Sequence, residues 1–165
     1  MKKLIMVLLS GVLGSTSLLY SQVIVSERTD MHYERQVFGV GVTAGPIEGA
    51  GISFRHHLPA PFSYTLNMGI IKVDENLHYA IGGDIQYDLA RSTNGRYFVL
   101  LGIGYYYSGS TSKNDLKGPL RVGLGMGAEF AVNGPLHVSL LGAFTFFSDG
   151  TILPLPHIGI HYYFY

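Results

Sequence analysis

The clearest pattern in the chain is the alternation of apolar with small or polar residues over positions 120–132. Apolar side chains occupy every second position, from Leu120 through Leu124 to Val132, and most of the positions between them hold glycine or a charged residue. Only an extended strand places alternate residues on opposite faces, because a helix with 3.6 residues per turn would scatter both sets around its surface. The pattern therefore predicts a β-strand with one apolar face.

Seven further segments alternate in the same way, at positions 37–44, 50–57, 62–73, 77–89, 96–107, 136–146 and 152–165. Short stretches rich in Gly, Pro, Asn and Asp separate them and predict turns, and the longest polar interruption is 108–118. Eight strands joined in sequence predict an all-β fold, an eight-stranded antiparallel up-and-down transmembrane β-barrel. We assign positions 36–165 to this single domain.

Alternation alone does not say which face of the barrel points outward, since a membrane barrel is apolar outside and a soluble lipocalin-like barrel is apolar inside. Charged residues make up only 13% of the chain, against roughly 25% in soluble domains. Tyr97 begins the apolar face of 96–107, and Tyr105 and Tyr107 end it, as in the two aromatic girdles of membrane barrels. We therefore predict an apolar exterior, and a secreted soluble barrel that binds a small apolar ligand is the alternative.

The amino-terminal segment has the layout of a secretory signal peptide. Lys2 and Lys3 precede an apolar run over 4–13, and small residues follow up to Ser21. We predict a signal peptide over 1–21, with cleavage after Ser17 as the alternative, and an amino-terminal arm over 22–35. The formal net charge of zero predicts no nucleic-acid partner, and the absence of cysteine excludes disulfides and thiol chemistry.

Together, the signal peptide, the eight alternating strands and the aromatic last strand resemble the small bacterial outer-membrane barrels, the group that includes OmpX, OmpW and the OmpA transmembrane domain. The resemblance implies location in the outer membrane of a Gram-negative-type bacterium, in contact with outer-membrane lipid. It also implies that the barrel-assembly machinery reads the carboxyl-terminal residues Tyr162, Phe164 and Tyr165. We expect a monomer without a cofactor that contributes to envelope integrity or surface interaction.

The inward face of the predicted barrel carries a set of ionisable residues. An eight-stranded barrel is just wide enough to be filled by side chains, and charges inside it must pair or reach water. We expect Arg55 and Arg121 to pair with nearby carboxylates and so to close the lumen, whereas a narrow ion path gated by such pairs is the alternative. The predicted network consists of Arg55, Asp84, Asp88, Arg121, Glu129, His137 and His161.

A second alternative is a lipid-modifying enzyme, because His137 and Ser139 resemble the His-x-Ser pair of outer-membrane lipid A deacylases. A histidine base needs an orienting carboxylate, and the only acidic residue after Glu129 is Asp149 in a loop. We therefore predict no catalytic residue, and the scattered histidines predict no metal site. The G-x-G repeats are expected to make room for bulky lumen groups such as Tyr106 and Arg121.

Overall fold

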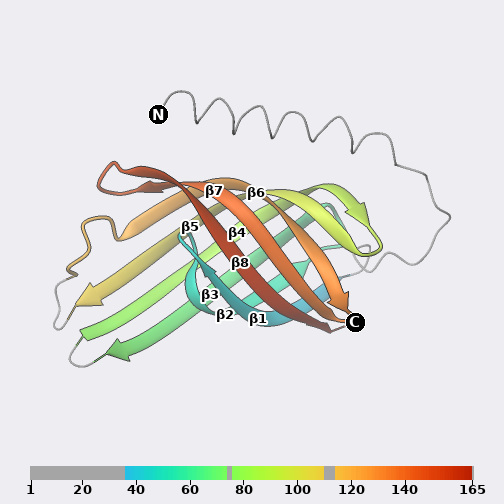
Figure 1. Ribbon diagram of the computed structural model, residues 1–165, viewed down its shortest axis with the longest axis horizontal. Coiled ribbons are helices and arrows are strands. Elements are labelled where there is room, and N and C mark those ends of the chain that lie inside the picture. Colours follow the sequence, from blue (N-terminus) through green and yellow to red (C-terminus); the bar gives the residue numbers. More distant parts are fainter. Residues whose placement is uncertain (1–35, 74–75, 110–113, 165) are drawn as a thin grey trace.

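The computed structural model describes residues 36–73, 76–109 and 114–164, and within them it forms a closed antiparallel barrel (Figure 1). Each strand pairs with the next in sequence, and β1 pairs with β8 to close the wall. The predicted eight-stranded barrel is therefore confirmed. The strands are β1 (Val37–Gly45), β2 (Gly49–His57), β3 (Phe62–Val73), β4 (Asn76–Ser92), β5 (Gly95–Gly109), β6 (Leu120–Asn133), β7 (Leu136–Phe147) and β8 (Ile152–Phe164).

Three predicted features fall outside the described residues: the signal peptide over 1–21, the arm over 22–35, and Tyr165. In the part of the chain that the structure covers, no helix is long and apolar enough to span a membrane.

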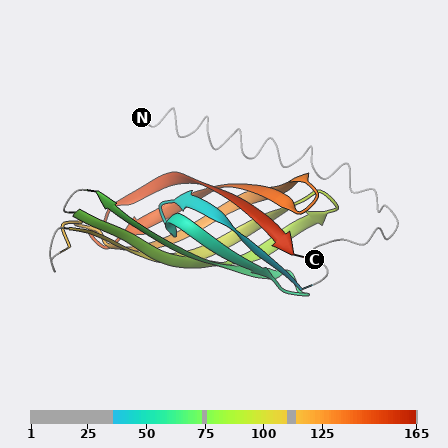
Figure 2. The same cartoon turned by 90° about the horizontal axis from the view of Figure 1, so that it is seen from below.

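The strands tilt around the barrel axis, as Figures 1 and 2 show. The register shows the stagger of the strands. Stepping from each residue to its partner on the next strand, from Val40 on β1 around the barrel, ends at Ile152 on β8, whereas the direct partner of Val40 on β8 is Tyr162. This stagger requires tilted strands. We call the end where β1 begins and β8 finishes the terminal end, and the opposite end the loop end.

Large apolar side chains cover the outside of the barrel. Leu101 and Leu124 face each other on β5 and β6 and are 58% and 57% exposed. Aromatic residues gather toward both ends of this outer surface. Neighbouring strands contribute the pairs Phe62 with Tyr87 and Tyr97 with Phe130 at the terminal end, and Tyr79 with Tyr105 and Tyr107 at the loop end.

The turn between β1 and β2 bends into the lumen, where Ile47 is 0% and Glu48 1% exposed. Glycines of β5 and β6 leave the space for it, because a Cβ atom at Gly104 or Gly123 would collide with Ile47. The G-x-G repeats were expected to make room for bulky lumen groups such as Tyr106 and Arg121. On β5 and β6, Gly102, Gly104 and Gly123 accommodate the turn instead, a contact between distant segments that strand alternation does not reveal.

Tyr106 and Arg121 hold this turn from the loop side. The Tyr106 hydroxyl donates to the carbonyl oxygen of Gly45 at 2.7 Å, and Arg121 Nη1 donates to the carbonyl oxygen of Pro46 at 3.2 Å. Toward the terminal end the turn packs on an apolar layer inside the barrel. The lumen is therefore apolar at this level, and the members of the layer are Ile47, Phe98, Leu100, Leu141 and Ala143.

Candidate functional site

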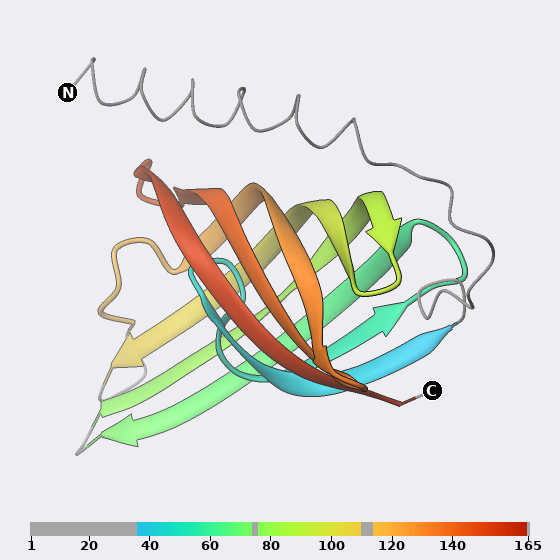
Figure 3. The same cartoon turned by 45° about the vertical axis from the view of Figure 1, so that its right-hand side comes forward.

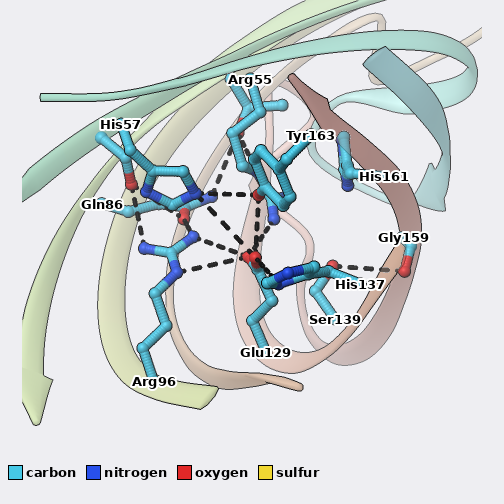
Figure 4. Close-up of polar contacts among 12 residues, drawn as sticks. Arg55, His57, Gln86, Arg96, Glu129, His137, Ser139, Gly159, His161 and Tyr163 are labelled. Atoms are coloured by element: carbon cyan, nitrogen blue, oxygen red, sulfur yellow. Dashed lines mark hydrogen bonds and ion pairs between the residues drawn. The ribbon is translucent and has the colours of Figure 1, made fainter. Parts of the chain in front are cut away.

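Glu129 of β6 is the centre of a buried polar network near the terminal end of the lumen (Figure 4). Its Oε2 atom accepts hydrogen bonds from Arg55 Nη1 at 2.6 Å and Arg96 Nη2 at 2.9 Å. Its Oε1 atom accepts one from the Tyr163 hydroxyl at 2.8 Å and lies 3.2 Å from His137 Nδ1. Four strands other than β6 thus converge on one carboxylate.

Arg96 of β5 is the second hub. Its Nη1 atom lies 2.6 Å from Asp88 Oδ1, and its Nη2 atom donates to Gln86 Oε1 at 2.5 Å. The guanidinium carbon also lies 4.5 Å from the centre of the Phe98 ring, which belongs to the apolar layer. Arg96 therefore joins the charged network to the apolar layer above it.

The buried charges of this network balance. Arg55 and Arg96 supply two positive charges and Asp88 and Glu129 two negative ones, all almost fully buried, and the more exposed Arg91 adds a further ion pair to Asp88 at 2.6 Å. Charges removed from water are tolerated only when paired and hydrogen-bonded. We call Arg55, Arg96, Asp88 and Glu129 the four-charge cluster.

The eighth strand contributes an aromatic ring to the same layer. The Tyr163 hydroxyl lies 2.8 Å from His57 Nε2, and the ring packs where β1 has a glycine, since a Cβ atom at Gly39 would come within 2.6 Å of it. Side chains from β2 to β8 thus meet in this layer, with β1 making room for one of them. The lumen is filled here by protein atoms.

The predicted lumen residues divide into two groups. Arg55, Asp88, Glu129 and His137 come together in the network. His161 lies beside it, with Nε2 2.9 Å from Ser53 Oγ. Arg121 and Asp84 lie outside the network, beside the inserted turn.

The expectation that Arg121 pairs with a carboxylate is wrong. Among the described residues its guanidinium contacts no carboxylate and lies over the rings of Tyr106 and Phe147, 3.6 and 4.8 Å from their centres. The turn over 46–48 separates Arg121 from the network. Arg121 points inward, as predicted, but it binds the Pro46 carbonyl oxygen and the Tyr106 ring instead of a carboxylate.

Asp84 is also absent from the ion pairs. Both its carboxylate oxygens are buried without a hydrogen-bond donor among the described residues, and the carboxyl group of Glu48 lies against it. His157 Nε2 is 3.9 Å from Glu48 Oε2. The inserted turn therefore brings a second acid to Asp84 where an arginine was expected.

Sequence reasoning missed Arg96 and Tyr163 as members of the network. Arg96 is the first residue of the predicted strand 96–107, and it shares the inward parity of Phe98. That parity was a usable signal for Arg96. Tyr163 reaches Glu129 only because β8 closes the barrel against β1, and no local sequence pattern indicates this contact.

The reason given against catalysis at His137 and Ser139 needs correction, because His137 does have a carboxylate neighbour, Glu129 on the adjacent strand. That carboxylate is occupied by two arginines, however. Ser139 Oγ points to the carbonyl oxygen of Gly159 at 3.5 Å, and both His137 and Ser139 are buried in the lumen. Within the described ranges, no cluster of three or more His, Asp or Glu side chains is placed to hold a metal ion.

Two of the residues predicted as an assembly signal, Tyr162 and Phe164, lie at the end of β8. Tyr162 and Phe164 point outward and are exposed, with ring centres 5.3 Å apart, and Phe164 faces Phe38 across the closing seam. Their recognition by the assembly machinery stays a prediction.

No family model matches the sequence, and no curated protein matches it. Solved structures with a similar fold include the outer-membrane protein Ail of Yersinia pestis in a phospholipid nanodisc, with 11% identity and a TM-score of 0.44 over 78% of this chain and 98% of Ail. Another is the Neisserial surface protein A, with 10% identity and a TM-score of 0.42 over 78% of this chain and 92% of that protein. These are likenesses of architecture, and they assign no family or activity to the chain.

Proposed function

We propose that this protein is an integral outer-membrane β-barrel that closes its own lumen and has a non-enzymatic role in envelope integrity or surface interaction. The observation that carries the proposal is the outer surface of the barrel, where exposed apolar side chains alternate with buried inward residues on every strand. A continuous apolar exterior is unfavourable in water and fits a hydrocarbon environment.

The positions of the aromatic side chains support the same environment. Tyr87 and Tyr97 lie toward the terminal end of the outer surface, and Tyr79 and Tyr105 toward the loop end. Tyrosine is enriched where a membrane meets water, because its ring is apolar and its hydroxyl group is polar. The apolar belt between the two groups would then contact outer-membrane lipid.

The connections between the strands suggest an orientation. The terminal-end connections span 58–61, 93–94 and 134–135, whereas the longest connection, 110–119 between β5 and β6, lies at the loop end. Membrane barrels of this kind have short periplasmic turns and longer external loops. The terminal end would thus face the periplasm, consistent with export by the predicted signal peptide.

The four-charge cluster and the apolar layer support a closed lumen. Together they occupy consecutive levels of the interior, so an ion path would have to cross both paired charges and packed hydrocarbon. The soluble alternative fits less well, because a lipocalin-like barrel needs an apolar interior and a polar exterior. We expect a monomer, assembled by machinery that reads Tyr162, Phe164 and Tyr165.

A refolding experiment tests the membrane location. The chain without residues 1–21 is refolded in phospholipid vesicles, and its gel migration is compared with and without boiling, beside fractionation of producing cells. We expect heat-dependent migration, recovery in the outer-membrane fraction and no steady conductance across planar bilayers. Folding in buffer without lipid or detergent would contradict the membrane proposal, and a stable conductance would contradict the closed lumen.

A further inference from the structure

The barrel wall is incomplete at the loop end, between β3 and β8 (Figure 3). The ladder between β1 and β8 ends where Ala44 faces Ile158, although β8 begins at Ile152. The ladder between β2 and β3 ends where Ile52 faces Met68, and β3 continues beyond it. Because the β1–β2 turn bends into the lumen, 70–73 and 152–156 have no strand partner on this side within the described residues. We call this opening the notch.

Two prolines mark the β8 edge of the notch. Pro154 and Pro156 face Phe144 and Gly142 of β7, and the other edge of β8 faces the notch. Proline has no N–H group to donate to a ladder, so it is tolerated in a strand where its nitrogen points away from a partner. The prolines therefore fit a permanently open edge, and they disfavour the addition of another strand there.

The inward face beside the notch is apolar and uncovered. Ile71 on β3 and Leu153 on β8 have inward parity, yet they are 58% and 42% exposed. Inward residues on strands that are paired on both sides, such as Thr65 and Thr145, are fully buried. We call the loop-end part of the lumen, toward which Ile71 and Leu153 point, the vestibule. Its exposed apolar lining indicates an apolar occupant.

An apolar groove runs down the outside of the barrel from the notch. It has a volume of about 680 Å³ and is lined mainly by aliphatic side chains. Ile71 also contributes to it, so the groove and the vestibule share a wall. Its other principal lining residues are Val42, Ile52, Met68, Ile70, Ile158 and Ile160.

We propose that the notch admits an acyl chain of a membrane lipid, which lies in the groove and passes between Ile71 and Leu153 into the vestibule. This inference rests on the proposed membrane location. The apolar surface is continuous from the lipid-facing belt through the notch, so a chain can enter sideways without crossing water. The turn at Ile47 closes the path below, which limits the occupant to the end of a chain.

The level of the notch fits a lipid of the outer leaflet. Ile70 at its edge pairs with Tyr79, which belongs to the loop-end aromatic group. Open strand edges are not tolerated against pure hydrocarbon, because their N–H and C=O groups would lack partners. At the level of the aromatic group, water and lipid headgroups can satisfy these backbone groups while the acyl chain covers the aliphatic side chains.

The test exploits the absence of tryptophan in the natural chain. Single-tryptophan variants Leu153→Trp, Leu124→Trp and Phe98→Trp are refolded in phosphatidylcholine vesicles with or without bromine on the acyl chains, which quenches nearby indoles. Leu124 lies on the closed outer wall and Phe98 inside the lumen, so they are the lipid-exposed and lipid-shielded controls. We expect Leu153→Trp to be quenched about as strongly as Leu124→Trp, and Phe98→Trp to be quenched weakly.

The outcomes separate the two proposals. Strong quenching of Leu124→Trp with Leu153→Trp as weak as Phe98→Trp would overturn the entry of a chain and leave the membrane location intact. Weak quenching of folded Leu124→Trp would overturn the membrane location itself. Quenching of Leu153→Trp by aqueous acrylamide but not by brominated lipid would show a water-filled vestibule and also overturn the proposal. Ile71→Trp on the opposite edge repeats the test if Leu153→Trp does not fold.

Discussion

The two ends of the lumen are built from the same alternating strands but are filled by different groups. At the terminal end all eight strands are paired, and the four-charge cluster fills the interior with ion pairs. At the loop end β1 and β2 stop short, their turn occupies the lumen, and aliphatic side chains such as Ile71 remain uncovered. Where the wall is closed, inward polar side chains form hydrogen bonds and ion pairs with one another. Where it is interrupted, inward apolar side chains stay exposed and can contact another molecule.

The same chemical change should have opposite consequences at the two ends. We expect Glu129→Gln to lower the free energy of unfolding by about 3–5 kcal/mol, because it leaves two buried arginines with only one carboxylate. The measurement is urea unfolding in lipid vesicles, followed by tyrosine fluorescence and gel migration.

Glu48→Gln is the matched control. The Glu48 carboxyl group lies buried beside Asp84 and contacts no arginine among the described residues, so replacing it by an amide removes no arginine–carboxylate ion pair and should leave stability unchanged or raise it. Equal losses for the two variants would show that charge balance does not distinguish the two ends.

The next largest effect concerns the outer wall that both ends share. We expect Leu124→Arg to cost about 2–4 kcal/mol in lipid vesicles, because its charge would lie near the middle of the hydrocarbon. Leu124→Ala, which removes the side chain without adding charge, is the control and should cost much less. A variant Leu124→Arg that folds in vesicles as well as Leu124→Ala does would contradict the apolar belt.

The inserted turn can be displaced by a single methyl group. We expect Gly104→Ala to cost about 1–3 kcal/mol, because its Cβ atom would collide with the backbone oxygen of Ile47. Gly142→Ala is the control, since a Cβ atom there meets nothing within 4 Å. Urea unfolding of the pair measures the difference, and similar stabilities would argue against the turn lying in the lumen.

The smallest expected effect concerns the hydrogen bond that holds the turn. Tyr106→Phe removes the donor to the Gly45 carbonyl oxygen and should cost about 0.5–1.5 kcal/mol. Hydrogen exchange of the backbone amides of 45–49 should quicken in this variant while that of the terminal-end strands stays unchanged. Equal exchange throughout would show that Tyr106 does not anchor the turn.

Much of the wall could be predicted from the sequence, because strand alternation is a local property. The period of two identified all eight strands and placed Arg55, Arg121 and Glu129 on the polar face, and the low charge content and the tyrosine positions then assigned that face to the interior. Side-chain direction follows from backbone geometry alone, so it needs no knowledge of distant residues. The same reasoning identified the outward set that includes Leu124 and Tyr97.

Partners inside the barrel could not be predicted in the same way. The meeting of Arg55 with Glu129 and the separation of Arg121 from every carboxylate depend on how far each strand is staggered around the closed wall. A turn of ordinary composition over 46–48 gives no local sign that it bends inward.

The sequence by itself therefore determined the number of strands, their order and the face to which each side chain points, because these follow from neighbouring residues along one chain. The tertiary structure decided that Glu129 receives two arginines, that Ile47 fills the space above Gly123, and that β3 and β8 are left apart at the loop end. These features arise from contacts between residues far apart in the chain, and such contacts exist only once the barrel has closed.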